Sequence, residues 1–151
     1  MKEEIVTINQ IYIDVDKKTK MDGLRFLAQK AVDHHIGEDE EVILKGLLQR
    51  EAESSTGFVD GFAIPHTRNE GVLKTGIIIM KTTQGIHWDS MDGNPAKFFI
   101  ALFVPISDTK RTHITLLSLL ARKMMSDEFK QKLLKSDNTN EIFGIIKDAI
   151  K

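Results

Sequence analysis

The sequence FFIALFV, residues 98–104, is the longest wholly apolar run in the chain. Pro105 ends the run, whereas a membrane-spanning helix needs about 18 or more apolar residues in succession. The run is therefore too short to cross a bilayer, but its length suits a strand that is covered by protein on both faces. We predict a central, fully buried strand over residues 98–104.

Two other segments carry the signals of strands in the same sheet. The sequence IIIM at residues 77–80 is rich in β-branched side chains and again suits a strand buried on both faces. Residues 11–15 alternate between apolar and polar side chains, so they predict an edge or half-buried strand. Residues 84–88 predict a turn or short hairpin element, and residues 92–95 (DGNP) predict a turn.

Five further segments have apolar residues at helical spacing: 21–32, 38–53, 113–125, 126–133 and 139–149. Thr19 is expected to cap the first helix, Gly37 to end it, and Thr112 to cap the third. The apolar stripe from Ile114 to Met125 is wide and predicts a broad buried face for the third helix. Buried strands mixed with amphipathic helices indicate an α/β domain, with helices on both faces of one sheet.

Length and composition narrow the class of protein. The chain has 151 residues, enough for one domain with a sizeable core. The formal net charge is −1, the pI is near 6.5 and no basic block is present, so we expect no nucleic-acid binding. The absence of cysteine excludes disulfides, thiolate metal ligands and a cysteine nucleophile. The first residues lack a signal-peptide core, and we expect a cytoplasmic protein.

The segment GFVDGFAIPHT, residues 57–67, is the candidate for the chemistry. Gly57 and Gly61 permit backbone angles that are closed to other residues and allow another molecule to approach closely. Pro65 fixes its own φ and favours an extended residue before it, so His66 follows a stiff dipeptide. The spacing supports two interpretations equally: a histidine held in one direction for chemistry, or a glycine-punctuated turn with an incidental surface histidine.

Several motifs together carry a resemblance to a known family. They are GFAIPH at residues 61–66, preceded by Arg50-Glu51 and Ser55-Thr56-Gly57, then Trp88-x-x-x-Asp92-Gly93-x-Pro95, and finally His113-x-x-x-Leu117-x-x-Leu120-Ala121. These motifs, in this order, span most of the chain. The chain resembles enzyme IIA of the fructose–mannitol class in the bacterial phosphoenolpyruvate-dependent sugar phosphotransferase system. Phe58, Val59 and Phe62 depart from the family pattern, which more usually has lighter residues at these positions.

The resemblance implies the fold, the role and the partners of the chain. Residues 1–151 would form a single three-layer α/β domain whose mixed β-sheet is flanked by α-helices on both faces. His66 would carry phosphate as a phosphohistidine intermediate, and His113 would lie in the same site. The phosphocarrier protein HPr would donate the phosphate and enzyme IIB would accept it, which links this domain to the membrane enzyme IIC during sugar uptake. Fructose, mannitol or another polyol stays open as the sugar.

The residue types suit this chemistry. A histidine nitrogen is a good phosphoryl acceptor because an ordinary pKa of about 6.5 leaves much of the ring neutral, with a free lone pair. Arg50 offers a planar fork that matches phosphate oxygens, and His113 begins a predicted helix, where free N–H groups attract anions. The sequence has no GxxxxGK[ST] loop, and we expect neither a nucleotide cofactor nor a metal.

A carrier role for His66 also predicts how exposed its ring should be. Two proteins that dock over the same histidine in turn require a shallow, exposed ring. Phe58 and Phe62 would then suit an apolar docking surface around it. The sequence also allows both phenylalanines to lie in the core, which is the preferred interpretation.

Two alternative functions stay open beside sugar transport, which is the preferred hypothesis. Members of the nitrogen-related branch of the same family serve no transporter and act by binding partners according to their phosphorylation state. A hydrolase or metal enzyme that uses His66 and His113 is the other alternative, although the sequence has neither a GxSxG elbow nor an HExxH helix.

Overall fold

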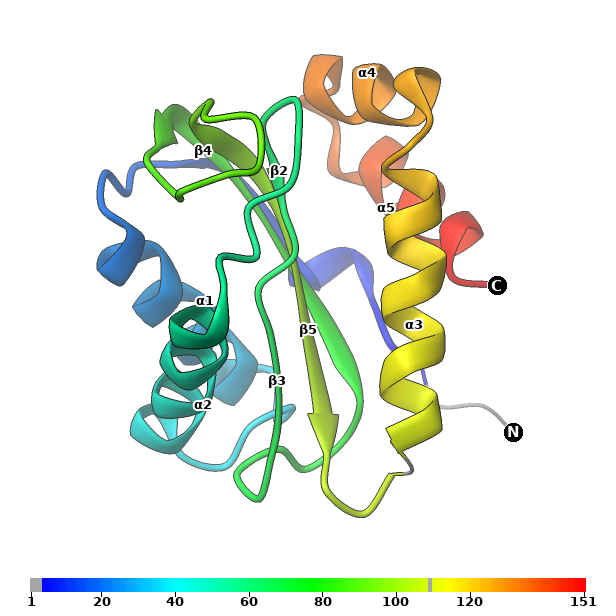
Figure 1. The fold of residues 1–151 in the computed structure, drawn as a ribbon. Helices are drawn as coiled ribbons and strands as arrows, with labels where there is room; N and C mark the ends of the chain where they lie inside the picture. The colour runs from blue at the N-terminus through cyan, green and yellow to red at the C-terminus, as the bar shows by residue number, and fades with distance from the viewer. Residues whose placement is uncertain (1–3, 109) are drawn as a thin grey trace.

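The computed structural model describes residues 4–108 and 110–151, which form one sheet between two helical layers (Figure 1). The elements in chain order are the 3-10 helix η1 (Ile8–Gln10), β1 (Ile11–Val15), α1 (Lys20–Asp33), α2 (Glu40–Glu53), β2 (Phe62–Ala63), β3 (His66–Asn69), β4 (Gly76–Ile86), β5 (Ala96–Pro105), α3 (Lys110–Lys123), α4 (Asp127–Lys135) and α5 (Thr139–Ala149). This order confirms the predicted α/β domain, and each predicted strand and helix is present.

The five-stranded sheet is mixed, as the resemblance implied. Its strand order is β1-β4-β5-β2, and β3 also pairs with β5. β1 runs parallel to β4, β4 runs antiparallel to β5, and both β2 and β3 run parallel to β5. β2 and β3 therefore form one edge strand that is interrupted at Ile64 and Pro65.

The central strand β5 supplies side chains to both cores of the domain. Its side chains at Phe99, Ala101 and Phe103 join α1 and α2 in one core, and those at Phe98, Ile100, Leu102 and Val104 join α3, α4 and α5 in the other. Figure 1 shows α1 and α2 on one face of the sheet and α3 and α5 on the opposite face. Because successive side chains point to opposite faces and both faces are covered, every position from 98 to 104 needs an apolar residue.

The start of α1 is as predicted, but its end is not. The hydroxyl of Thr19 accepts a backbone N–H of the first turn at 3.1 Å. At the other end His35, with φ of 58°, takes the left-handed conformation that Gly37 was expected to supply. Gly37 serves close packing instead, because a Cβ there would lie 2.9 Å from Cγ1 of Ile43.

For residues 84–86 the turn is wrong but the hairpin alternative holds, because β4 continues past a register shift and pairs Ile86 with Ala96 of the antiparallel strand β5. The predicted cap of the third helix is wrong. Helix α3 already begins at Lys110, so Thr112 lies inside the helix and does not cap it. The turn at residues 92–95 is confirmed in part, with Gly93 at φ of 77°.

The apolar stripe of α3 is narrower in the structure than in the sequence. Leu116 and Leu120 are buried against the sheet, and Met124 follows them into the core. Ile114 is 54% exposed and Met125 is 75% exposed, so the ends of the predicted stripe face outward. In the part of the chain that the structure describes, no helix combines the length and apolar character needed to cross a bilayer.

Gly57 is required by a close approach within the chain itself. A Cβ at this position would lie 2.5 Å from Oγ and 2.8 Å from Cα of Ser90. The second of these atoms belongs to the backbone and cannot rotate away. The close neighbour anticipated for Gly57 is therefore another segment of the same chain.

We predict that Gly57→Ala lowers the free energy of unfolding by about 1–3 kcal/mol, because the new methyl group forces the backbone at Ser90 to move. Urea denaturation measures the change. Gly144→Ala is the matched control: Gly144 lies in α5, and a Cβ added there would meet no other packed atom within 4 Å. That control should raise the free energy of unfolding by about 0.5–1 kcal/mol. A stabilising Gly57→Ala would contradict the packing argument.

Candidate active site

His66 begins the second half of the interrupted edge strand. The carbonyl of Pro65 accepts the N–H of Leu102 in β5 at 2.9 Å, and His66 then pairs in register with Leu102. Proline has no N–H to donate, and because the N–H and C=O of an extended residue point to the same side, the donor that Pro65 lacks would have faced β5. The backbone on both sides of the break is thus tied to β5, which fixes where the His66 side chain starts.

Both ring nitrogens of His66 have a partner. Nδ1 lies 2.7 Å from the carbonyl oxygen of Ile64, and Nε2 lies 3.1 Å from Nε of Arg50. The carbonyl can only accept, so Nδ1 carries the proton and donates it. The arginine nitrogen can only donate, so Nε2 presents its lone pair. The two contacts specify the same neutral tautomer.

The surroundings also keep the ring neutral. Burial is the largest cause that lowers the pKa of His66, and the charges of Arg50 and His113 lower it further. The hydrogen bond to Ile64 and the carboxylate of Glu51 raise the pKa without reversing the overall direction. At neutral pH the ring is therefore an uncharged imidazole with its lone pair on Nε2.

His66 is less accessible than the sequence suggested. The residue is 7% exposed, so the expectation of a shallow, exposed ring is wrong. The ring is reached through a hollow of about 320 Å³ whose lining includes His66, His113, Arg50, Arg68, Gln49 and Glu53. Phe62 is fully buried, which confirms the preferred interpretation and excludes the alternative of a docking surface at this residue. Phe58 is half-buried against the same core, as the preferred interpretation held.

His113 comes from the first turn of α3 and lies beside His66. The ring centroids are 5.3 Å apart and the planes meet at 66°. Burial is the largest cause that lowers the pKa of His113, followed by the charges of Arg68, Arg50 and Lys110. Its Nε2 is buried and has no hydrogen-bond partner among residues 4–108 and 110–151. The structure thus places a second neutral imidazole, with an unused polar atom, against the first.

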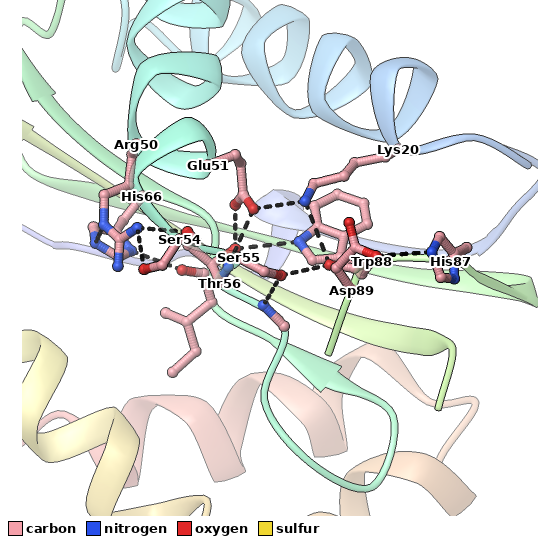
Figure 2. Close-up of polar contacts among 12 residues, drawn as sticks. Lys20, Arg50, Glu51, Ser54, Ser55, Thr56, His66, His87, Trp88 and Asp89 are labelled. Atoms are coloured by element: carbon pink, nitrogen blue, oxygen red, sulfur yellow. Dashed lines mark hydrogen bonds and ion pairs between the residues drawn. The ribbon is translucent and has the colours of Figure 1, made fainter. Parts of the chain in front are cut away.

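Arg50 reaches the site differently from the sequence expectation. Its Nε donates to Nε2 of His66, and its Nη1 donates to the carbonyl of Ser54 at 2.8 Å (Figure 2). The guanidinium is therefore not an open fork in this state. It covers the nitrogen that bears the lone pair, at the end of α2 (Glu40–Glu53).

Sequence reasoning missed Arg68, the other cation of the hollow. Its Nη2 donates to the carbonyls of Ile106 and Asp108 at 2.8 and 2.9 Å, which aligns the side chain along the loop before α3. The signal was available: Arg68 is two residues after His66 in an extended strand, so both side chains lie on the same side.

The histidine and acidic side chains of the described residues are not arranged as metal ligands. Within the described ranges, which omit residues 1–3 and 109, no three histidine or acidic side chains are grouped so that they could hold a metal ion. The hollow at His66 is lined instead by another imidazole and two guanidinium groups, together with the side chains of Gln49, Glu53, Thr67 and Asn69.

Fold and site together define a three-layer α/β protein centred on a neutral histidine beside cationic side chains. The chain belongs to the family described as phosphoenolpyruvate-dependent sugar phosphotransferase system, EIIA 2, whose model matches residues 4–149. This match confirms the resemblance seen in the sequence.

Individual relatives fall into both branches of the family. A fructose-specific EIIA component of Haloferax volcanii is 29% identical over 147 residues, which cover 97% of this chain and 95% of that protein. The crystal structure of the nitrogen regulatory protein IIA-Ntr from Neisseria meningitidis has a TM-score of 0.88 and 25% identity, covering 94% of this chain and 96% of the other. The mannitol IIA of Escherichia coli, solved in complex with phosphorylated IIB, shares the fold with a TM-score of 0.80 and 18% identity, covering 95% and 97% of the two chains.

We predict that His66 titrates below its ordinary pKa of about 6.5 and that the Nδ1–H form is the only neutral tautomer above that midpoint. Long-range ¹H–¹⁵N NMR of the imidazole measures both properties. Because the folded pKa is lowered, the unfolded chain binds the proton more tightly. The contribution of His66 to stability is therefore complete above about pH 6.5 and declines as the pH falls below that value. A midpoint above 6.5, or the Nε2–H tautomer, would contradict the geometry.

Proposed function

We propose that this protein is a phosphoryl carrier of a sugar phosphotransferase system, which accepts phosphate from phosphorylated HPr on Nε2 of His66 and passes it to enzyme IIB. The observation that carries the proposal is the pair of contacts at 2.7 and 3.1 Å that leave Nε2 as the nucleophilic nitrogen at the hollow. A neutral imidazole nitrogen with a free lone pair is the group that phosphoryl acceptance requires.

The transfer can be written on these atoms. The lone pair of Nε2 forms a bond to phosphorus, the bond between phosphorus and the donor breaks, and its electron pair returns to the donor. Nδ1 keeps its proton on the carbonyl of Ile64 throughout, so no proton has to leave the His66 ring. The onward step to enzyme IIB reverses the same bond changes with a different partner.

Arg50 and His113 would contact the phosphoryl group while it is being transferred. The Nε–H of Arg50 lies where the phosphoryl group must bind, so Arg50 has to give up its contact with Nε2 and can then donate to the phosphoryl oxygens. The buried, unpartnered Nε2 of His113 can serve as a second donor if it carries the proton of its ring. Donors fixed in advance around developing charge lower the barrier to transfer.

The first test is phosphorylation of His66 itself. Incubation with phosphoenolpyruvate, enzyme I and HPr should add one acid-labile, base-stable phosphoryl group to the wild-type protein, and none to His66→Ala. Intact-mass spectrometry measures the addition, and the exposed His87→Ala serves as the control that should behave as wild type. Full phosphorylation of His66→Ala would reject the assignment.

His113→Ala should still accept phosphate on His66 but pass it on more slowly, by about tenfold to a hundredfold, because one donor to the transferring group is lost. Rapid-quench measurement of transfer to a cognate enzyme IIB gives the rate, and affinity for IIB should change little. An unchanged rate would remove His113 from the mechanism.

A regulatory role of the nitrogen type is the second candidate, supported by the likeness to the Neisseria meningitidis protein. The phosphorylated protein can be mixed with purified fructose- and mannitol-type enzyme IIB. Transfer to one of them supports the transport role. Failure with all of them, together with a binding partner that responds to the phosphorylation state of His66, supports the regulatory one.

A further inference from the structure

Two consecutive residues at the end of α2 act on the two nitrogens of His66. Arg50 donates directly to Nε2, as described above. Glu51 does not touch the ring, but its carboxylate holds the loop that carries the partner of Nδ1. Figure 2 shows Glu51 between Lys20 on one side and the backbone of the 54–56 segment on the other.

The Glu51 carboxylate is buried and fully engaged. Its side chain is 6% exposed, and Oε1 accepts the backbone N–H of Thr56 at 3.1 Å and lies 2.9 Å from Nζ of Lys20. Oε2 accepts the hydroxyl of Thr56. A buried carboxylate is tolerated only with such partners, and the same contacts fix the position of Thr56.

The hydroxyl of Thr56 has two partners at once. It donates to Glu51 and accepts the indole N–H of Trp88 at 3.2 Å. Trp88 is fully buried and lies under the ammonium group of Lys20, at 5.2 Å from the ring centroid. Only a hydroxyl can satisfy a carboxylate and an indole N–H in this way, so residue 56 has to be threonine or serine.

Two hydrogen bonds to backbone carbonyls connect Thr56 to the ring of His66 by way of Ile64. The carbonyl of Thr56 accepts the N–H of Ile64 at 3.0 Å, and the carbonyl of Ile64 accepts Nδ1–H of His66 at 2.7 Å. Pro65 is tied to β5 through its carbonyl, whereas the N–H of Ile64 bonds to Thr56, so the hydrogen bond from Ile64 to Thr56 holds Ile64 between β2 and β3.

We propose that Glu51 and Thr56 are positioning residues for phosphoryl transfer: through Thr56 and Ile64 they hold the proton of His66 on Nδ1 and so keep the lone pair on Nε2. The tautomer of a histidine is set by the partner of its protonated nitrogen. The inference rests on the proposed function only in naming phosphoryl transfer as the reaction. The assignment of the tautomer to the Glu51–Thr56 contact stands apart from it.

The decisive variant is Thr56→Val, which keeps the shape of the side chain but leaves the carboxylate of Glu51 and the indole of Trp88 without the hydroxyl. We expect long-range ¹H–¹⁵N NMR to show part of His66 as the Nε2–H tautomer. We also expect phosphorylation by phosphorylated HPr to slow by about tenfold, because a small misplacement of the reacting group is enough to do this. Thr56→Ser keeps the hydroxyl and should match the wild type in both measurements.

A control separates positioning from general stability. Lys81 is 6% exposed, and its Nζ donates to the carbonyls of Leu134 and Ser136 at 2.7 Å, away from His66. Lys81→Met should destabilise the protein without changing the tautomer of His66. The fluorescence of Trp88, the single tryptophan, reports whether its contact with residue 56 persists in each variant.

The outcomes are distinct. A folded Thr56→Val that keeps wholly Nδ1–H His66 overturns the proposal, as does one that transfers at the wild-type rate. If Thr56→Val does not fold, Glu51→Gln removes the charge at nearly constant size, and the same two results decide. If the wild-type protein accepts no phosphoryl group, the proposed function fails, while the tautomer in the unphosphorylated variants still decides whether Glu51 and Thr56 position His66.

Discussion

The hydrogen bond from Nδ1 of His66 to the carbonyl of Ile64 is the contact on which the site depends. It sets the tautomer, and it uses a carbonyl between β2 and β3, where Ile64 points its N–H to Thr56 and not to β5. Because the N–H and C=O of an extended residue point to the same side, the carbonyl of Ile64 also faces away from β5 and can accept from the ring two residues on. Pro65 favours the extended backbone at Ile64 that the contact requires. The segment between β2 and β3 is therefore part of the site.

His66 has to be neutral, so that its ring offers a lone pair, and it also has to lie beside a group that can bind an anion. Burial and the position of Arg50 together meet both requirements. A histidine with a raised pKa would be protonated at neutral pH and would have no lone pair to offer. Burial lowers the pKa of His66, and Arg50 reinforces the effect with a positive charge that also points a donor at Nε2. The same arginine thus disfavours protonation of the unphosphorylated ring and stands close enough to meet an anion bound there. A lysine would supply the charge but not the planar geometry that reaches Nε2 and the Ser54 carbonyl together.

The fold could be predicted from the sequence to the extent that it follows from local patterns. The run at residues 98–104 is apolar at every position because β5 faces two cores, and that pattern is visible without any partner. Gly37 and Thr112 failed as helix signals because tertiary packing, which no local pattern contains, decides where α1 ends and α3 begins. In the site, the motifs indicated His66, His113 and Arg50. The roles of Glu51 and Thr56 depend on contacts with Lys20 and Trp88, which lie 31 and 32 residues away in sequence and have no periodic signature.

Among residues 4–108 and 110–151, two buried nitrogens at the hollow have no hydrogen-bond partner: Nε of Arg68, and Nε2 of His113, which is a donor in the tautomer that protonates it. An unsatisfied buried polar group costs about 1–3 kcal/mol, and at a functional site a ligand or a second state of the protein can supply the missing partner. Under the proposed function that state is the phosphorylated one, because a phosphoryl group on Nε2 of His66 would bring acceptor oxygens into the same hollow. Arg50 would change partners at that point, while its Nη1 contact with Ser54 keeps the guanidinium near the ring. Under the proposed function the site is thus arranged for the charge that it would receive, and the ring of His66 would keep its Nδ1 contact in both states.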